Sequence, residues 1–179
     1  MYVSQKSYAF YSMFWIFLLF WSSQLSCLEA GDLAPDFSLE ASDGKTYQLS
    51  EVLKEHIVVI AWYPRAFTSG CTIECKSLAE NGYLIKKMQV AYFMASVDPL
   101  VKNIDFALQN EADFPILSDP SKETAKKYEV LTMGLFAKRH TFYIDKNRTI
   151  LFIDRNVRPS QSAQDIAAKL KELGVGMRS

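Results

Sequence analysis

The stretch HIVVIAWYPRAFTSGC, residues 56–71, decides the fold because it leads from a buried strand into a helix. Its first half, His56–Tyr63, is a continuous apolar and β-branched run, which is typical of a central strand covered on both faces. Pro64 ends the run, and a loop leads to Cys71, where a helical pattern begins that extends to about Met88. A strand, a loop and a helix in this order predict an α/β fold.

The segments on either side extend the same pattern. Upstream, residues 36–49 alternate apolar and polar side chains around a Ser-Asp-Gly turn, which predicts a β-hairpin. Downstream, strands and helices alternate before a second hairpin and a closing helix, over residues 90–97, 100–111, 114–119, 121–130, 140–154 and 162–174. We therefore expect a three-layer α/β/α sandwich with a mixed central sheet and an N-terminal hairpin.

Size and charge restrict the function classes. The chain has 179 residues, a length that favours one domain over two. Lys and Arg together number 20, and Asp and Glu also number 20, so the formal net charge is zero. Because the sequence has no basic field, we do not expect it to bind nucleic acid or an anionic membrane surface. Catalysis or contact with another protein fits this composition better.

The N-terminus has a different composition from the rest. Phe10–Trp21 is almost wholly apolar, and Lys6 is the only charge before it. This layout is typical of a secretory signal, whose apolar core is about 7–15 residues long, and an uncleaved membrane anchor is the alternative. We expect a signal peptide or anchor over residues 1–30 and one domain over residues 31–179. The protein is then exported, periplasmic or secreted, and contacts a membrane only through this segment if it stays uncleaved.

The predicted domain contains two cysteines, Cys71 and Cys75, which could form a metal clip, a structural disulfide or a reactive thiol with a partner. A thiol in the first turn of a helix lies at the positive end of the helix dipole, near unpaired N–H groups, and both favour the thiolate. Thr68 can turn its hydroxyl toward the sulfur or toward a bound oxygen atom, and Pro64 would shield the sulfur from water. These neighbours favour the reactive thiol.

The same residues carry a resemblance to a known family. Pro64, Thr68 and Cys71 stand at the spacing of Pro-x-x-x-Thr-x-x-Cys, which resembles the active-site motif of peroxiredoxins. Trp62-Tyr63 before it and Thr72 after it resemble the Q-type, or bacterioferritin-comigratory-protein-like, branch. The resemblance covers most of residues 31–173, including GDLAPDFSLEASDGKTYQLS, ASVDP, DFPILSDPS and RHTFYIDKN. It implies a thioredoxin-like fold.

By this resemblance, Cys71 is the peroxidatic cysteine, whose thiolate attacks the O–O bond of a peroxide and becomes a sulfenic acid. Thr68 and the backbone N–H of Cys71 would hold the peroxide oxygens, beside Pro64. The family's arginine falls at Arg139, which would stabilise both the thiolate and the developing negative charge. Glu74 resembles a glutamate that orients this arginine in some branches. The resemblance also implies a peroxide substrate, a thioredoxin-like reductant, a monomer, and no cofactor or metal.

The position of the second cysteine departs from the family pattern. Q-type enzymes often place a resolving cysteine five residues after the peroxidatic one, but Cys75 follows Cys71 after four. In an intact helix these positions hold their Cβ atoms about 5–6 Å apart, whereas a disulfide needs about 3.5–4.5 Å. We therefore expect Cys75 to resolve Cys71 only after the first helical turn unwinds, with an outside thiol as the alternative resolver.

Two other functions use similar residues. A copper chaperone of the Sco type, also thioredoxin-like, would take Cys71, Cys75 and His140 as ligands, since thiolates and imidazole suit copper. That pattern includes a proline after the second cysteine, where this sequence has Lys76. A thiol–disulfide oxidoreductase on the same fold would use Cys-x-x-Cys, and the spacing here differs. The peroxidase therefore explains more of the residues.

Overall fold

The apolar run after His56 forms β3 (Ile57–Trp62), a central strand with partners on both sides. It runs parallel to β4 (Val90–Ser96) and antiparallel to β8 (His140–Ile144). Its residues after Ile57 are all buried. The prediction of a central buried strand is confirmed.

The structure is a computed structural model that describes residues 27–176. Most of the predicted signal segment, residues 1–30, therefore lies outside the described residues. Within the described part of the chain, no helix combines the length and the apolar character needed to cross a membrane.

Seven strands form one mixed sheet in the order β2-β1-β5-β4-β3-β8-β9. Strands β3, β4 and β5 (Ile116–Ser118) run parallel, so their carboxyl ends meet at one edge of the sheet. The predicted N-terminal hairpin, β1 (Ser38–Ala41) and β2 (Thr46–Gln48), extends the sheet beyond β5. On the other side, β9 (Ile150–Asp154) pairs with β8. The fold is the predicted α/β fold with a mixed sheet.

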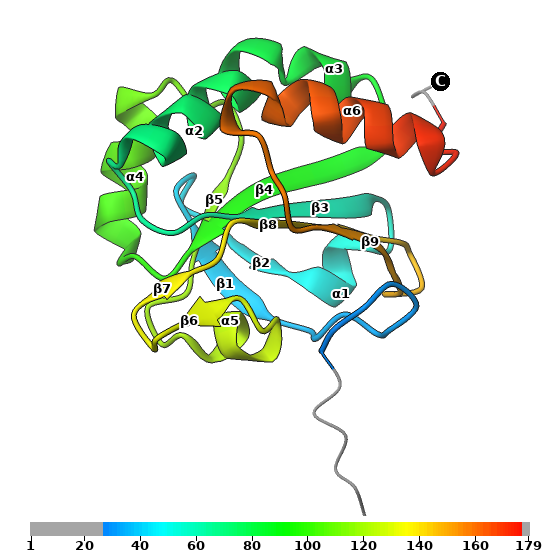
Figure 1. The fold of residues 1–179 in the computed structure, drawn as a ribbon, viewed down its shortest axis with the longest axis horizontal. Helices are drawn as coiled ribbons and strands as arrows, with labels where there is room; N and C mark the ends of the chain where they lie inside the picture. Colours follow the sequence, from blue (N-terminus) through cyan, green and yellow to red (C-terminus); the bar gives the residue numbers. More distant parts are fainter. Residues whose placement is uncertain (1–26, 177–179) are drawn as a thin grey trace, which may run out of the picture.

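Helices cover both faces of the sheet (Figure 1). One face carries the longer helices and one short one, namely α2 (Ser69–Asn81), α3 (Tyr83–Lys86), α4 (Leu100–Gln109) and α6 (Ser162–Glu172), which follows the 3₁₀ turn η1 (Pro159–Gln161). The other face carries short elements, namely α1 (Leu49–Val52), α5 (Glu123–Lys127) and the small hairpin of β6 (Leu131–Thr132) and β7 (Phe136–Ala137). The three predicted layers are present, and one of them is thin.

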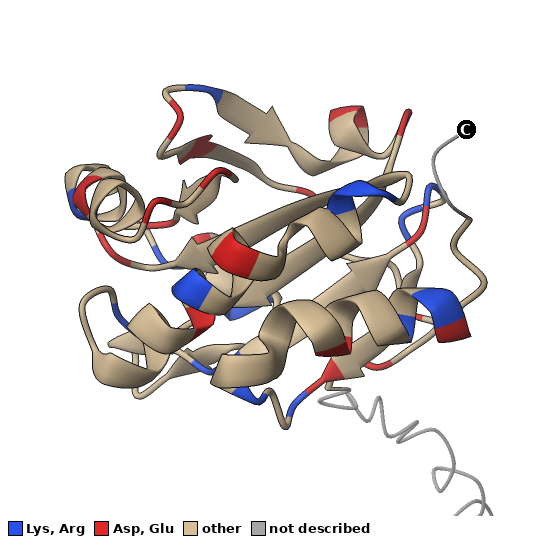
Figure 2. Ribbon diagram, turned by 90° about the horizontal axis from the view of Figure 1, so that it is seen from above, with Lys and Arg blue, Asp and Glu red and all other residues tan. Residues whose placement is uncertain are grey.

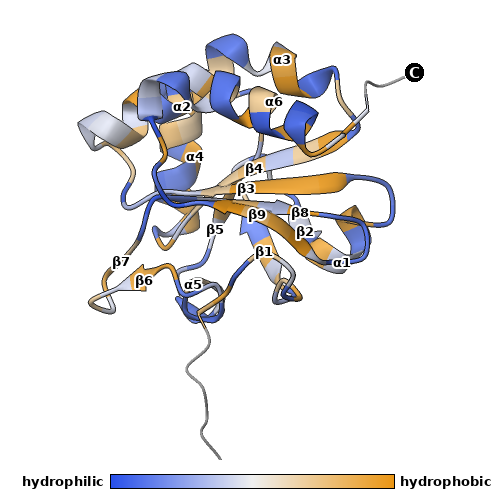
Figure 3. Cartoon of the chain, turned by 45° about the vertical axis from the view of Figure 1, so that its right-hand side comes forward, coloured by the Kyte–Doolittle hydropathy of each residue, from blue (hydrophilic) through white to orange (hydrophobic). Residues whose placement is uncertain are grey.

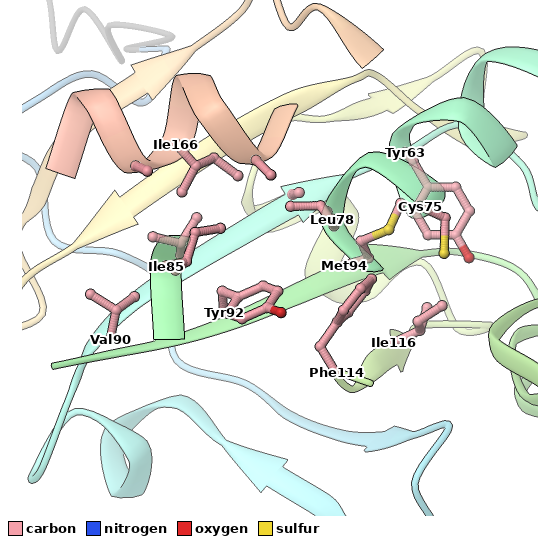
Figure 4. Packing of buried hydrophobic residues seen from close by; sticks show 14 of the residues in the cluster. Tyr63, Cys75, Leu78, Ile85, Val90, Tyr92, Met94, Phe114, Ile116 and Ile166 are labelled. Carbon is pink, nitrogen blue, oxygen red and sulfur yellow. The ribbon is translucent and has the colours of Figure 1, made fainter. Parts of the chain in front are cut away.

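Successive residues of β3 point into two different hydrophobic clusters. Val59 faces the cluster under α2 and α6, whereas Ile60 faces the cluster above α1 and α5. Figure 3 shows β3 as strongly hydrophobic, while α2 and α6 alternate between hydrophobic and hydrophilic residues, as helices with one buried face do. Acidic and basic residues are interspersed along the described elements (Figure 2). Figure 4 shows that the first cluster includes Cys75 as well as aliphatic and aromatic side chains.

The structure corrects the predicted helix between Cys71 and Met88. The helix begins earlier, at Ser69, and is interrupted at Gly82, after which α3 starts. At the interruption only a glycine fits, because a Cβ on residue 82 would stand 2.4 Å from the hydroxyl of Tyr92. The small hairpin of β6 and β7 was not predicted.

Candidate active site

The loop after β3 delivers Cys71 to the first turn of α2. Thr68 precedes the helix in an extended conformation, and its carbonyl accepts the first helical hydrogen bond, from the N–H of Thr72 at 2.9 Å. The Thr68 side chain does not cap the helix, because its hydroxyl donates to the carbonyl of Arg65 at 3.0 Å. The first N–H groups of a helix have no partner within the helix. The N–H of Cys71 is therefore available to a ligand.

Buried contacts fix the path of this loop. The N–H of Ala66 donates to Asp98 Oδ2 at 2.8 Å, and Lys102 donates to the other oxygen of Asp98 at 2.6 Å. Phe67 adopts a positive φ of 68° and packs edge-on against Phe106, with ring centroids 5.3 Å apart. The loop is thus held against the start of α4.

Arg139 reaches the cysteine from the segment between β7 and β8. Its Nη2 donates to the Sγ of Cys71 at 3.1 Å, and its Nη1 donates to the carboxylate of Glu74. Only 19% of the Arg139 side chain is exposed, so the guanidinium faces the sulfur in a partly desolvated site. Gly70 leaves room for it, since a Cβ there would stand 3.3 Å from Nη2. The structure therefore brings together a thiol, a guanidinium and a carboxylate.

The carboxyl group of Glu74 titrates near neutrality. Its side chain is fully buried, and burial raises its pKa to about 7, although the charge and hydrogen bond of Arg139 act in the opposite direction. Burial also lowers the pKa of Arg139, but the negative charges of Glu74 and Cys71 outweigh this effect and raise that pKa overall. The guanidinium keeps its charge, while the charge of Glu74 depends on pH.

Cys75 lies one helical turn after Cys71, in the same hydrophobic cluster. Both are free thiols and both are buried, and the helix that carries them is continuous over Ser69–Asn81. Burial, together with the negative charges of the nearby Glu74 and Cys71, raises the pKa of Cys75 to about 12. Cys75 is therefore a protonated core thiol in this conformation. The disulfide predicted from the sequence requires this part of α2 to open.

Most of the predicted residues gather at one site. Cys71, Glu74 and Arg139 are in contact, and Thr68 begins the same helix. Pro64 is half-buried at the end of β3 and starts the loop. The hydroxyl of Thr68 points to a carbonyl rather than to the sulfur, so its oxygen is left as an acceptor.

His140 does not complete a metal site. It lies in β8 opposite Trp62, and burial lowers its pKa, as do the cations Arg155 and Lys138. Within residues 27–176, no group of three His, Cys, Asp or Glu side chains is arranged to hold a metal ion. The structure therefore does not favour the copper-chaperone hypothesis.

A buried polar network beneath the loop was not predicted from the sequence, and neither was the role of Ser162 described below. Ser96 and Asn103 lie under Asp98, and the Tyr63 hydroxyl donates to Asn103 Oδ1 at 2.6 Å. A signal was available in ASVDP, where polar residues follow an apolar strand beside the carboxyl end of β3. Ser162 is a buried residue of α6 for which the sequence offers no signal.

Similarity to known proteins agrees with this geometry. Residues 30–153 match the AhpC/TSA family. A Mycobacterium tuberculosis protein described as a peroxiredoxin is 33% identical over 129 residues, which are 69% of this chain and 83% of that protein. Peroxiredoxin Bcp of Escherichia coli K12 is 34% identical over 103 residues, covering 58% of this chain and 65% of its own.

Solved structures show the same fold. The crystal structure of peroxidoxin BcpB from Mycobacterium tuberculosis has a TM-score of 0.74 and 29% identity, and covers 85% of this chain and 99% of its own. The structure of a Xylella fastidiosa PrxQ mutant has a TM-score of 0.75 at 22% identity, covers 83% of this chain and 99% of its own, and supports the fold alone. The chain therefore belongs to the AhpC/TSA family and is a peroxiredoxin, a thiol-dependent peroxidase.

Proposed function

We propose that the peroxidase reaction of this protein takes place at Cys71. The observation that carries the proposal is the hydrogen bond of 3.1 Å from Arg139 Nη2 to the sulfur, in the first turn of α2. The helix N-terminus and the guanidinium both present positive charge to the thiol, and both favour the thiolate, which is the nucleophilic form.

The neighbouring groups fit a bound hydroperoxide. The thiolate attacks one peroxide oxygen, so that an S–O bond forms and the O–O bond breaks. The leaving oxygen takes up a proton and departs as water or as an alcohol, and Cys71 becomes a sulfenic acid. Arg139 faces the negative charge that develops. The Thr68 hydroxyl, whose proton is given to the Arg65 carbonyl, can accept a hydrogen bond from the hydroperoxide O–H.

We propose Cys75 as the resolving thiol. After α2 opens, the Cys75 sulfur bonds to the sulfenic sulfur of Cys71, and the sulfenic oxygen leaves as water. A thioredoxin-like dithiol then restores both thiols by disulfide exchange. The position of both cysteines on one helix supports this pairing.

The decisive test of the peroxidatic residue is Cys71→Ser. We expect the wild type to consume hydrogen peroxide and organic hydroperoxides with thioredoxin as donor, and the variant to consume none above background. Equal rates in the two proteins would show that the reaction occurs elsewhere.

The role of Cys75 is tested separately with Cys75→Ser. Mass spectrometry of the wild type after one equivalent of peroxide is expected to find a Cys71–Cys75 disulfide, and the variant is expected to lose turnover with thioredoxin. Unchanged turnover in Cys75→Ser means that an outside thiol resolves Cys71.

We also propose that the protein is exported and acts as a monomer with an exported thioredoxin-like reductant. The apolar segment Phe10–Trp21 supports export, as signal or as anchor, and the similarity to Q-type peroxiredoxins supports the monomer. Cell fractionation with N-terminal sequencing tests the first point, and light scattering after size-exclusion chromatography tests the second. A cytosolic protein with an intact N-terminus contradicts export.

A further inference from the structure

The carboxylate of Glu74 uses only one of its two oxygens. Oε2 accepts a hydrogen bond from Arg139, whereas Oε1 is buried and has no hydrogen-bond partner among the described residues. A buried carboxylate oxygen without a partner is costly and rare in proteins. We therefore expect a hydrogen-bond donor close to this oxygen.

Ser162 on the neighbouring helix has a buried hydroxyl that lacks an acceptor in the described structure. It is the first residue of α6, is 1% exposed, and its hydroxyl has no hydrogen-bond partner within residues 27–176. Helix α6 and the turn η1 pack against α2, and Figure 1 shows α6 beside α2 on the same face of the sheet. The N–H of Ala163 approaches Ser77 Oγ of α2 at 3.4 Å, which fixes the start of α6 one turn along from Glu74.

The two groups are close and chemically matched. Burial has the largest effect on the pKa of Glu74 and raises it, whereas Arg139 and, more weakly, the hydroxyl of Ser162 lower it. An ionised carboxylate can only accept hydrogen bonds, whereas a serine hydroxyl carries a proton that rotates to suit its surroundings. A hydrogen bond from the hydroxyl to the carboxylate would satisfy both groups.

We propose that Ser162 is a positioning residue, whose hydroxyl donates to Glu74 Oε1 and thereby holds the Glu74–Arg139 pair against the sulfur of Cys71. The proposal rests on the proposed function of Cys71. It extends the site to the C-terminal helix, which the motif around Cys71 does not include. Ser162 does not touch the substrate and acts only through Glu74.

The rate of peroxide attack should then depend on whether Glu74 carries a proton. The charged and titratable groups around Glu74 are Arg139 before β8, Asp154 in β9, and Cys71 and Cys75 on its own helix. When Glu74 takes up a proton it loses the charge that holds Arg139, so the rate of peroxide attack falls as the pH drops through the pKa of Glu74. Without the Ser162 hydroxyl, Glu74 keeps its proton to a higher pH.

The experiment measures the second-order rate constant of the purified protein with hydrogen peroxide, by stopped flow, between pH 5 and pH 9. A hydrogen bond to a charged group changes a pKa by about one unit. We therefore expect Ser162→Ala to move the acid-side midpoint of the profile up by about one pH unit. Ser162→Thr and Ser162→Val have side chains of the same shape, but only Thr carries a hydroxyl. The pair therefore separates the effect of the hydroxyl from the effect of packing, and only the Thr variant is expected to keep the wild-type midpoint.

Two controls make the result specific. Ser77→Ala removes a buried hydroxyl that joins the same two helices, and it should leave the midpoint unchanged. In a Glu74→Gln background, Ser162→Ala should have no further effect, because position 74 no longer titrates. Identical midpoints in Ser162→Val, Ser162→Thr and the wild type overturn the proposal, as does an equal shift in Ser77→Ala. A wild type no faster than Cys71→Ser instead overturns the proposed function.

Discussion

Arg139 is the residue on which the site depends most, because one guanidinium contacts both the Cys71 sulfur and the buried Glu74. A lysine has the same charge but offers only a point charge on a flexible chain, so it cannot keep both contacts. We expect Arg139→Lys to lower the rate constant for hydrogen peroxide by about 10²–10³-fold, the usual loss for one donor to a developing charge. Stopped-flow fluorescence measures this rate.

The matched control for Arg139 is Arg155→Lys. Arg155 forms an ion pair with Glu29, outside the site, at 3.2 Å. We expect this variant to react as fast as the wild type. A loss smaller than about threefold in Arg139→Lys, set against the range for a lost donor, would contradict the role given to the guanidinium.

Glu74 also makes the stability of the reduced protein depend on pH. Burial raises its pKa from the ordinary value of 4.5 to about 7, so the folded state binds the proton more tightly than the unfolded chain does. The resulting stabilisation is present below pH 4.5 and is lost as the pH rises through about 7. We compare the free energy of unfolding of the wild type with that of Glu74→Gln. As the pH rises between these limits, we expect this difference to shift against the wild type by up to about 3 kcal/mol.

Urea unfolding of both reduced proteins at pH 5 and pH 8 measures this effect. Other titrating groups are common to the two proteins and cancel in the difference. A difference in unfolding free energy that does not change with pH contradicts the raised pKa of Glu74.

At the scale of elements, the junction between α2 and α3 has room only for a glycine at position 82. A Cβ there would stand 2.4 Å from the Tyr92 hydroxyl and 2.5 Å from the Leu78 carbonyl oxygen. Because both distances are far below contact, we expect Gly82→Ala to destabilise the protein by about 1–3 kcal/mol, as overpacked cores do. Denaturant unfolding measures it, and adding Tyr92→Phe is expected to recover part of the loss. Gly174→Ala, whose Cβ would meet nothing within 4 Å, is a control for local strain alone at a positive φ of 76°.

Helix α2 must also open during the proposed cycle. In the reduced protein it is continuous over Ser69–Asn81 and holds both cysteines. We expect hydrogen exchange in this helix to accelerate after one equivalent of peroxide, while exchange in β4 stays slow. The Cys75→Ser variant should show no such change, because it cannot form the bond. Equal protection of α2 in both oxidation states would mean that Cys75 does not pair with Cys71.

For the whole molecule, apolar runs were sufficient to predict the mixed sheet, and a spaced motif located the centre of the candidate site. The run after His56 is buried on both faces, so its sequence pattern does not depend on any particular neighbour. Cys71 and Thr68 are close in sequence, so their geometry follows from one helix start. Arg139 was placed by resemblance, and the structure gives the distance.

The parts that could not be predicted depend on contacts between distant segments. The resemblance alone assigns Glu74 a role beside the arginine, and its burial depends on the packing of α6 over α2. Likewise, Ser162 becomes part of the site only through that packing, and the close approach to Gly82 comes from Tyr92 of another strand. Periodicity carries no information about such contacts.

In the proposed cycle, the burial of Cys75 makes the two halves respond differently to temperature. Attack on peroxide uses a thiol already in place, whereas resolution by Cys75 requires α2 to unfold locally, and unfolding rates rise about 3–6-fold per 10 °C. Cooling therefore lengthens the lifetime of the sulfenic acid more than it slows its formation. Excess peroxide in the cold then has time to convert Cys71 to sulfinic acid. We therefore expect excess peroxide to inactivate a larger fraction of the protein in the cold than at higher temperature.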